Sequence, residues 1–285
     1  MDIWVAVVLI AIAVSTAYSA WKQTSFSIIV SAACMFVFMV ELIADQITTG
    51  GILSELGFMP TDLTHPAYLY TLLTSMYAHA SFQHILWNVI GLVFIGMIFE
   101  QRIGVRPFIL LYFLSGLVGT LVFAALHWNS AALVVGASGA ISGVLGGSAR
   151  LFPNERISLF FLPPMSVWGI VGIFVLVQIL IVFTSSHIAF EAHLGGLAAG
   201  ILLAPFIKKI PLQDRAKKMI APPSLRRLAT TPELESLLQR IENEEVPDVK
   251  SAWIEHFLSK AKCPHCGSPL KATKEAIVCE KGHRI

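Results

Sequence analysis

Residues 136–152 read GASGAISGVLGGSARLF, and this stretch carries the clearest indication of the fold. Gly139, Gly143 and Gly147 recur at every fourth position, so they lie on one face of a helix. A stripe of small residues lets two helix backbones approach closely inside a membrane. The stretch therefore predicts a helix packed tightly in a membrane bundle, with Ser138 in its first turn.

The composition of the whole chain favours a membrane location. The 285 residues have a mean hydropathy of +0.73, and 13% of them are charged, whereas soluble domains contain about 25% charged residues. A membrane-spanning helix needs about 20 mostly apolar residues. We therefore predict an all-α polytopic membrane protein. Its seven spans are expected at residues 3–20, 25–44, 82–100, 106–126, 137–152, 165–184 and 189–207.

The positive charges predict the orientation, because Lys and Arg favour cytoplasmic loops. All 20 Lys and Arg fall in one set of loops and in the tail that begins at Lys208. The opposite set, which holds the N-terminus and loop 45–81, contains none. We expect a cell-membrane protein with its N-terminus outside and its tail in the cytoplasm. Residues 1–20 could instead be a signal peptide, but they lack a positively charged start, which favours a retained helix.

Four polar side chains stand out within the spans, because such groups are costly in hydrocarbon and usually mark function. They are His84, Asn88, Ser138 and His193. The third, fifth and seventh spans all enter the membrane from outside, so the four residues share one depth. His84 and Asn88 are four apart and therefore lie on one helical face.

A second stripe of small residues, Gly196 and Gly200, follows His193 in the seventh span. If the two stripes face each other, Ser138 and His193 come within hydrogen-bond reach; otherwise the stripes only pack helices. A serine attacks a carbonyl when a base takes its proton, and histidine is the usual base. Glu191 faces another side of its helix, so the pattern indicates a Ser–His dyad without a third acidic member.

The same arrangement offers donors for an oxyanion. Free backbone N–H groups point out of a helix N-terminus, where Ser138 is expected, and the His84 and Asn88 side chains can add further donors. Ser142 is expected to hydrogen-bond to its own helix. His187 is a rival base, but it lies in or beside the outer loop.

Four motifs, in this order, resemble those of the rhomboid family of intramembrane serine proteases. They are HASFQHILWN at 79–88 (His-x4-His-x3-Asn), Glu100-Gln101-Arg102 with Gly104 (Glu-x-Arg-x-Gly), GASG at 136–139 (Gly-x-Ser-Gly) and AHLGGLAAG at 192–200 (Ala-His-x2-Gly-x3-Gly). The similarity covers about residues 45–207.

The resemblance implies a six-helix core, with one extra N-terminal helix before it. It implies Ser138 as nucleophile, His193 as general base, and His84, Asn88 and the Ser138 N–H as the oxyanion site. Glu100 and Arg102 would be structural. Substrates would be single-pass membrane proteins cut near the outer face of the bilayer, with no cofactor needed for cleavage.

Two positions depart from the family pattern. The family often has an aromatic residue four positions after the serine, stacked on the base, where this chain has Ser142. Its first loop often carries Trp-Arg, where this chain has Tyr70-Thr71. A catalytically silent rhomboid-like protein that binds or chaperones membrane helices is the alternative function. A transporter with histidine proton relays ranks lower, because acidic partners lie only near the ends of the spans.

The tail ends in a pattern typical of a metal site. Cys263-x2-Cys266 and Cys279-x3-His283 supply four ligands in two turns, which suits tetrahedral zinc in a zinc-ribbon-like fold. His265 could replace His283, or the ribbon could have lost its metal. We expect a structural zinc. The role of the tail stays open between docking of a protein partner, recruitment of substrate and contact with nucleic acid, and its mixed charge does not favour nucleic acid.

The domains expected from these patterns are an extra helix at 1–22, a rhomboid core at 23–207, a basic linker with a helical segment at 208–260, and a zinc-ribbon-like domain at 261–285.

Overall fold

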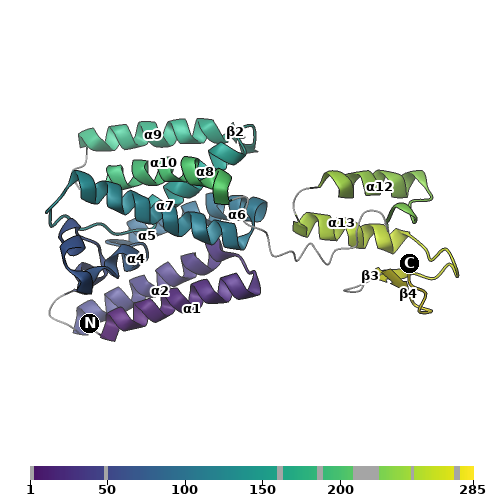
Figure 1. The fold of residues 1–285 in the computed structure, drawn as a ribbon, viewed down its shortest axis with the longest axis horizontal. Coiled ribbons are helices and arrows are strands. Elements are labelled where there is room, and N and C mark those ends of the chain that lie inside the picture. The colour runs from purple at the N-terminus through teal and green to yellow at the C-terminus, as the bar shows by residue number, and fades with distance from the viewer. Residues whose placement is uncertain are drawn as a thin grey trace. The chain divides into compact units, whose positions relative to one another are not determined.

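The computed structural model describes residues 3–47, 51–158, 163–184, 189–207, 225–244, 247–272 and 277–285. The chain divides into two compact units, Met1–Ile210 and Pro211–Ile285, whose helices and strands are labelled in Figure 1. His187 and the first part of the predicted basic linker, residues 208–224, lie outside the described residues.

Helices occupy all seven segments that were predicted to span the membrane. They are α1 (Ile3–Lys22), α2 (Phe26–Ile47), the continuous run α5 (Phe82–Gly91), η3 (Leu92–Gly96) and α6 (Met97–Ile103), then α7 (Val105–Leu126), α8 (Ser138–Leu151), α9 (Val167–Thr184) and α10 (Phe190–Ile207). Within the described ranges, 5 of these helices are long and apolar enough to cross a membrane. The apolar part of α9, Val167–Phe183, is shorter, and α8 has 14 residues. The chain is a multi-pass integral membrane protein.

Helix α8 is the centre of the first unit. It packs against α7, α9, α10 and η3, and nearly all of its side chains from Ala140 to Ala149 are buried. Helix α1 packs on α2 and α7, on the side of the bundle opposite α9 (Figure 1). A helix surrounded on all sides has little room for side chains, which explains the many glycines and serines of α8.

The two glycine stripes face each other, which is the condition under which the sequence places Ser138 and His193 within hydrogen-bond reach. A Cβ atom added at Gly196 would lie 2.1 Å from the carbonyl oxygen of Gly139, and one at Gly200 would lie 1.8 Å from that of Gly143. Both distances are far below a normal contact, so only glycine fits at these positions. The backbones of α8 and α10 therefore touch directly along two turns.

Residues 51–81 form a chain of short helices between α2 and α5. The helices are α3 (Leu53–Leu56), η1 (Pro60–Thr64), η2 (Pro66–Tyr68) and α4 (Thr71–Thr74). Phe58 pairs with Val134 through two backbone hydrogen bonds of 2.9 and 2.8 Å, and buried Asp62 accepts from the Thr71 hydroxyl at 3.0 Å. The Phe58–Val134 bonds fix the segment against the loop that precedes α8, and the Thr71–Asp62 bond holds the segment together. At the other end of α8, β1 (Arg156–Ile157) and β2 (Met165–Ser166) pair antiparallel.

Buried Glu100 links the end of the third span to the start of α2. Its carboxylate accepts hydrogen bonds from the backbone N–H groups of Phe26 and Ser27 and from the hydroxyls of Ser25 and Ser27. A helix N-terminus has unpaired N–H groups, so Glu100 acts as a cap supplied by another helix. Arg102, two residues on, pairs with Glu155 at 3.2 Å.

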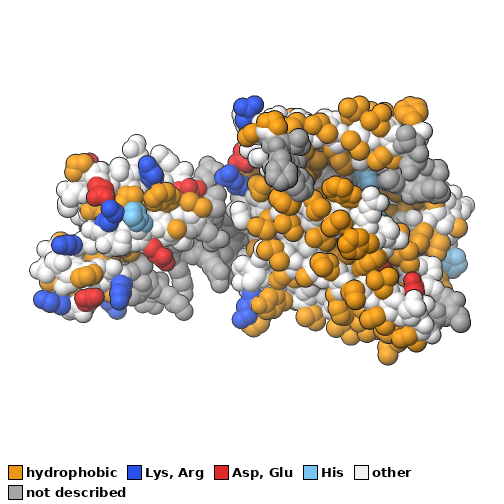
Figure 2. Space-filling view, turned by 180° about the vertical axis from the view of Figure 1, so that it is seen from behind, with side chains coloured by type: hydrophobic (Ala, Val, Ile, Leu, Met, Phe, Trp, Pro, Cys, Tyr) orange, Lys and Arg blue, Asp and Glu red, His pale blue; other side chains and the backbone are white. Residues whose placement is uncertain are grey.

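The surface of the first unit is apolar. Figure 2 shows hydrophobic side chains over most of the face in view, whereas charged side chains are frequent on the second unit. On α9 alone, Ile173, Leu176, Val177, Ile179 and Leu180 are all exposed. Such a surface suits hydrocarbon rather than water.

The second unit joins two helices and a small hairpin around one core. It contains α12 (Pro232–Asn243), α13 (Pro247–Lys260), β3 (Leu270–Ala272) and β4 (Ile277–Cys279), and β3 and β4 are antiparallel. Thr231 caps α12 by accepting from Leu234 N–H at 3.3 Å. The core includes Phe257 from α13 together with Cys263 and Cys279, so the helical segment and the cysteine-containing segment bury a common set of side chains.

Candidate functional site: a serine, two histidines and an asparagine at a cavity

The structure brings Ser138 and His193 into contact. The Oγ atom of Ser138 lies 2.6 Å from Nε2 of His193. Ser138 is the first residue of α8, and His193 lies in the first turn of α10. The glycine contacts hold the two helices together just beyond these residues, so the hydrogen bond follows from the backbone packing.

His84 and Asn88 lie on α5, one turn apart. The Ser81 hydroxyl caps this helix by accepting from His84 N–H at 3.2 Å. The Asn88 amide donates to the His84 carbonyl at 2.9 Å. The oxygen of the Asn88 side chain, Oδ1, is buried and has no hydrogen-bond partner among the described residues. Asn88 therefore has hydrogen-bonding capacity that the protein itself does not use.

Gly136 explains how α5 can approach the start of α8. Its φ of +111° is rarely adopted by other residues, and an added Cβ would lie 2.6 Å from Nε2 of His84 and 3.7 Å from Nδ2 of Asn88. A side chain at this position would collide with the His84 ring, so glycine lets the backbone before α8 lie directly against α5.

All four predicted site residues line one cavity of about 800 Å³. Its walls come from α5, α7, α8, α9 and α10, and include the apolar side chains of Trp87, Leu145 and Phe174. The site thus combines a hydroxyl in contact with an imidazole, donors on α5, and the free N–H groups of a helix N-terminus. Such a combination can hold a carbonyl group and attack it.

Three other polar residues near the site are hydrogen-bonded to groups other than Ser138 Oγ and the His193 ring. Ser142 donates to the Ser138 carbonyl at 2.7 Å, which confirms its expected back-bond. Glu191 contacts Nε2 of His127 at 2.9 Å, so its carboxylate is engaged away from His193. Nδ1 of His79 is hydrogen-bonded to the Tyr77 carbonyl at 2.9 Å, and its ring packs edge-on against His84.

Gln178 is a site residue that was not predicted from the sequence. Its Oε1 atom lies 2.9 Å from Nδ1 of His193, and its side chain is buried. A signal is present, because Gln178 is a strongly polar residue inside the apolar stretch 165–184. The sequence does not define the rotation of α9 about its axis, so it does not show that this side chain faces His193.

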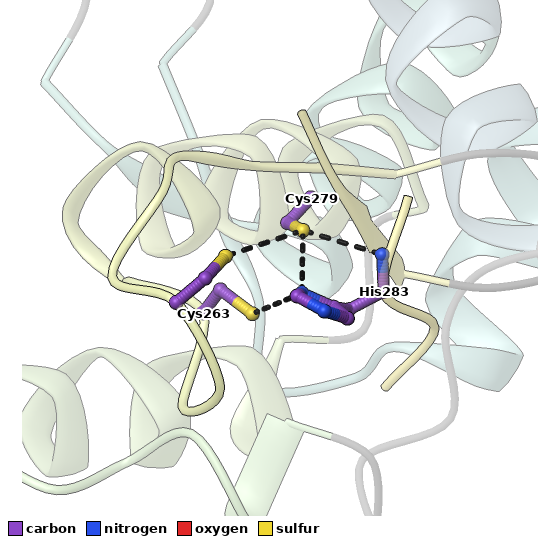
Figure 3. Close-up of side chains that lie close together, drawn as sticks. Cys263, Cys279 and His283 are labelled. Atoms are coloured by element: carbon purple, nitrogen blue, oxygen red, sulfur yellow. Dashed lines mark hydrogen bonds between the residues drawn. The ribbon is translucent and has the colours of Figure 1, made fainter. Parts of the chain in front are cut away.

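The second unit contains the predicted cluster of Cys263, Cys266, Cys279 and His283, whose ligand atoms all lie within 4.8 Å of one another. Figure 3 shows Cys263, Cys279 and His283 converging from the two turns. Two Sγ atoms are 3.6 Å apart, and Nδ1 of His283 lies 3.7 and 3.4 Å from two sulfurs. Tetrahedral zinc requires about 3.8 Å between sulfurs and about 3.5 Å between sulfur and nitrogen, so the four residues can hold this metal.

The local environment also favours a thiolate at this cluster. Hydrogen bonds from the Ser268 hydroxyl and backbone lower the pKa of the Cys266 thiol to about 6. Metal binding needs deprotonated sulfur, so these hydrogen bonds favour the form of Cys266 that a metal binds, whereas burial raises the pKa of the Cys263 thiol.

Fold and site together define a polytopic membrane protein in which a serine and a histidine meet at a cavity between helix ends. The Rhomboid domain matches residues 66–210, and the chain belongs to the rhomboid family. RHOMBOID-like protein 1 of Arabidopsis thaliana is 34% identical over 154 residues, which cover 53% of this chain and 38% of that protein.

Two further relatives carry the word protease in their names. Rhomboid-like protease 3 of Toxoplasma gondii is 26% identical over 198 residues, covering 66% of this chain and 71% of the relative. Putative rhomboid protease YdcA of Bacillus subtilis is 32% identical over 140 residues, covering 47% and 65%. The chain spans less than half of the plant proteins RHOMBOID-like protein 1 and RHOMBOID-like protein 5, at 38% and 48% of their lengths.

Proposed function

We propose that this protein is an intramembrane serine endopeptidase that cleaves transmembrane segments of single-pass membrane proteins. The observation that carries the proposal is the 2.6 Å contact between Ser138 Oγ and His193 Nε2, at a cavity that can admit a peptide carbonyl. Membership of the rhomboid family supports the proposal, and an assay of cleavage by this chain tests it.

In the proposed reaction, His193 takes the Ser138 proton as Oγ attacks the scissile carbonyl carbon. The tetrahedral intermediate then collapses, and the protonated His193 gives its proton to the leaving amine. An acyl-enzyme on Ser138 remains. Water, activated by His193, releases the new C-terminus and restores the serine. No cofactor takes part in these steps.

The oxyanion of the intermediate would lie between α5 and the start of α8. The Ser138 N–H belongs to the first turn of α8, where backbone donors are free and the helix dipole favours negative charge. The side chains of His84 and Asn88 line the same cavity as Ser138. Donors fixed in advance around developing charge are usually the largest single contribution to catalysis.

The length of α8 supports cleavage below the membrane surface. Its 14 residues span about 21 Å at 1.5 Å per residue, whereas the hydrocarbon core is about 30 Å thick. We further propose the orientation predicted from the charges, with the N-terminus outside and the tail cytoplasmic. To test this orientation, single cysteines are introduced in the loop 127–135 and in α12, and intact cells are treated with a membrane-impermeant maleimide. We expect labelling in the loop and none in α12. Labelling in α12 and none in the loop would reverse the orientation.

The decisive experiment compares purified wild type with Ser138→Ala on a single-pass test substrate in detergent. Ser148→Ala is the matched control, because this buried serine lies on the same helix but not at the cavity. We expect cleavage by wild type and Ser148→Ala and none by Ser138→Ala. Equal cleavage by all three removes Ser138 as the nucleophile.

The alternative, a silent protein that binds or chaperones helices, predicts no cleavage by any variant. A fluorophosphonate probe, which modifies activated serines, then separates the two functions. Labelling that depends on both Ser138 and His193 supports a protease tested on the wrong substrate. Absence of labelling supports the silent protein.

For the tail, we propose that Cys263, Cys266, Cys279 and His283 bind one structural zinc ion. The near-tetrahedral spacing of the ligand atoms supports this, and so does the burial of two of the cysteines in the core of the unit. The zinc would hold the two turns of the hairpin together. We also propose that the membrane core ends near residue 207 and that the tail serves to bind a protein partner.

A further inference from the structure

Gln178 is the second hydrogen-bonding partner of His193. Its Oε1 atom lies 2.9 Å from Nδ1, on the side of the ring opposite Ser138. The side chain is 4% exposed. Because the imidazole is held through both nitrogens, one by α8 and one by α9, its orientation is determined by two helices besides its own.

The position of Gln178 on α9 is unusual for its chemistry. The inward face of this helix carries Val167, Ile170 and Val171, all buried, and continues through Phe174 to Gln178. This helical periodicity predicts an apolar side chain at position 178, where the chain has the amide of Gln178. A buried amide in a membrane needs hydrogen bonds to offset its desolvation, and His193 supplies one.

The direction of the hydrogen bond selects one tautomer of His193. An amide oxygen can only accept, so the Nδ1 atom that faces Oε1 must carry the hydrogen. In a neutral imidazole, Nε2 then has a free lone pair and can accept a proton. This is the nitrogen that contacts Ser138 Oγ, so the contact to Gln178 puts the basic atom of the ring in front of the hydroxyl.

We propose that Gln178 is a positioning residue for His193, fixing the tautomer and ring orientation that the serine requires. In serine hydrolases with a triad, an aspartate does this and also stabilises the imidazolium by charge; here a neutral amide supplies the orientation without the charge. The inference rests on the proposed protease function, since it assigns His193 as the base.

Phe174 supports this role of α9. It lies one turn before Gln178, and its ring centroid is 6.4 Å from that of His193 at an interplanar angle of 49°. The position on α8 where an aromatic side chain was expected holds Ser142, whose hydroxyl bonds to its own helix. The two side chains of α9 that contact or lie beside the His193 ring are therefore Gln178 and Phe174.

The test compares Gln178→Met and Gln178→Glu with wild type on the single-pass test substrate. Methionine keeps the length of the side chain but removes the amide oxygen, so we expect kcat to fall about tenfold to a hundredfold, the range seen when metal-binding histidines lose the partner of their second nitrogen. KM should stay within about twofold, because Gln178 makes no contact with substrate in the proposed reaction. Leu176→Met, on the exposed face of α9, is the matched control and should behave as wild type.

Gln178→Glu provides a readout that a merely structural role would not move. A carboxylate keeps the acceptor and also favours the imidazolium, so we expect activity at high pH to recover, with the acid limb of kcat/KM displaced to higher pH. The other titratable groups that act on His193, His84 and Glu191, are the same in every variant. This comparison remains decisive even if Gln178→Met fails to fold.

The outcomes separate this inference from the proposed function. If wild type cleaves, Ser138→Ala does not, and Gln178→Met has wild-type kcat, then Gln178 has no positioning role while the protease stands. The same conclusion follows if Gln178→Glu leaves the acid limb in place. Equal cleavage by wild type and Ser138→Ala overturns both proposals.

Discussion

Gly200 of α10 lies so close to Gly143 of α8 that a Cβ atom at residue 200 would be 1.8 Å from the Gly143 carbonyl oxygen. Backbone atoms on both sides set this distance, so no side-chain rearrangement can relieve a larger residue. The same contact fixes the separation of the two helices whose first turns carry Ser138 and His193.

We therefore expect Gly200→Ala to impair activity from two turns away. The methyl group must push α10 from α8, and displacing catalytic groups by about 1 Å costs about a hundredfold in rate. Overpacking should also destabilise the bundle by about 1–3 kcal/mol. Cleavage rate and thermal unfolding measure the two effects. Gly172→Ala on α9 is the control, since its Cβ meets nothing within 4 Å; equal loss in both variants would contradict the close-packing argument.

Asn88→Ala tests the oxyanion site. If the Asn88 amide stabilises the intermediate, kcat should fall about a hundredfold to a thousandfold while KM changes little, the usual cost of one such donor. Steady-state kinetics on the test substrate provide the measurement. Gln83→Ala is a useful comparison, because Gln83 also lines the cavity but has no part in the proposed reaction. A rise in KM with unchanged kcat for Asn88→Ala would assign the residue to substrate binding instead.

Glu100→Ala should be among the most destabilising single changes in the membrane unit. It leaves two backbone N–H groups at the start of α2, and two serine hydroxyls, without their acceptor. Unsatisfied buried donors cost about 1–3 kcal/mol each before relaxation, and we expect a net loss of about 3 kcal/mol in unfolding free energy. Glu155→Ala breaks only the partly exposed pair with Arg102 and should cost less than about 1 kcal/mol. Similar losses for the two variants would show that Glu100 is not an essential cap.

Cys279→Ser should abolish zinc binding by the full-length protein. Cys279 touches both His283 and Cys266 through its sulfur, so its loss removes the central ligand. Elemental analysis should give about one zinc per chain for wild type and less than about a tenth for the variant. His265→Ala is the matched control: its ring packs on His283, but it does not belong to the ligand cluster. Loss of zinc in His265→Ala with retention in His283→Ala would exchange the two histidines.

The contact of Ser138 with His193 could be predicted because two simple periodicities act together. Glycines every four residues predict which faces of α8 and α10 meet, and the alternation of the spans predicts the depth. The convergence of Cys263, Cys266, Cys279 and His283 follows from local spacing in the same way. In each case, a few neighbouring residues contain the information.

Other features depend on contacts that no local pattern contains. Gln178 reaches His193 only because of the rotation of α9 about its axis, which apolar residues on all sides of the helix leave undetermined. The π-helical turn Leu92–Gly96, which separates Asn88 from Glu100, has no marker in its residues LVFIG. The capping of α2 by Glu100 joins residues 73 to 75 positions apart, a pairing that only the folded bundle defines.

That last pairing also sets an order of events during synthesis. The chain is made from its N-terminus, so Phe26 enters the membrane well before Glu100, 74 residues later, has been added. Until then, the first N–H groups of α2 lack the carboxylate that they bind in the finished protein. The start of α2 therefore acquires its carboxylate cap only when the third span has been made.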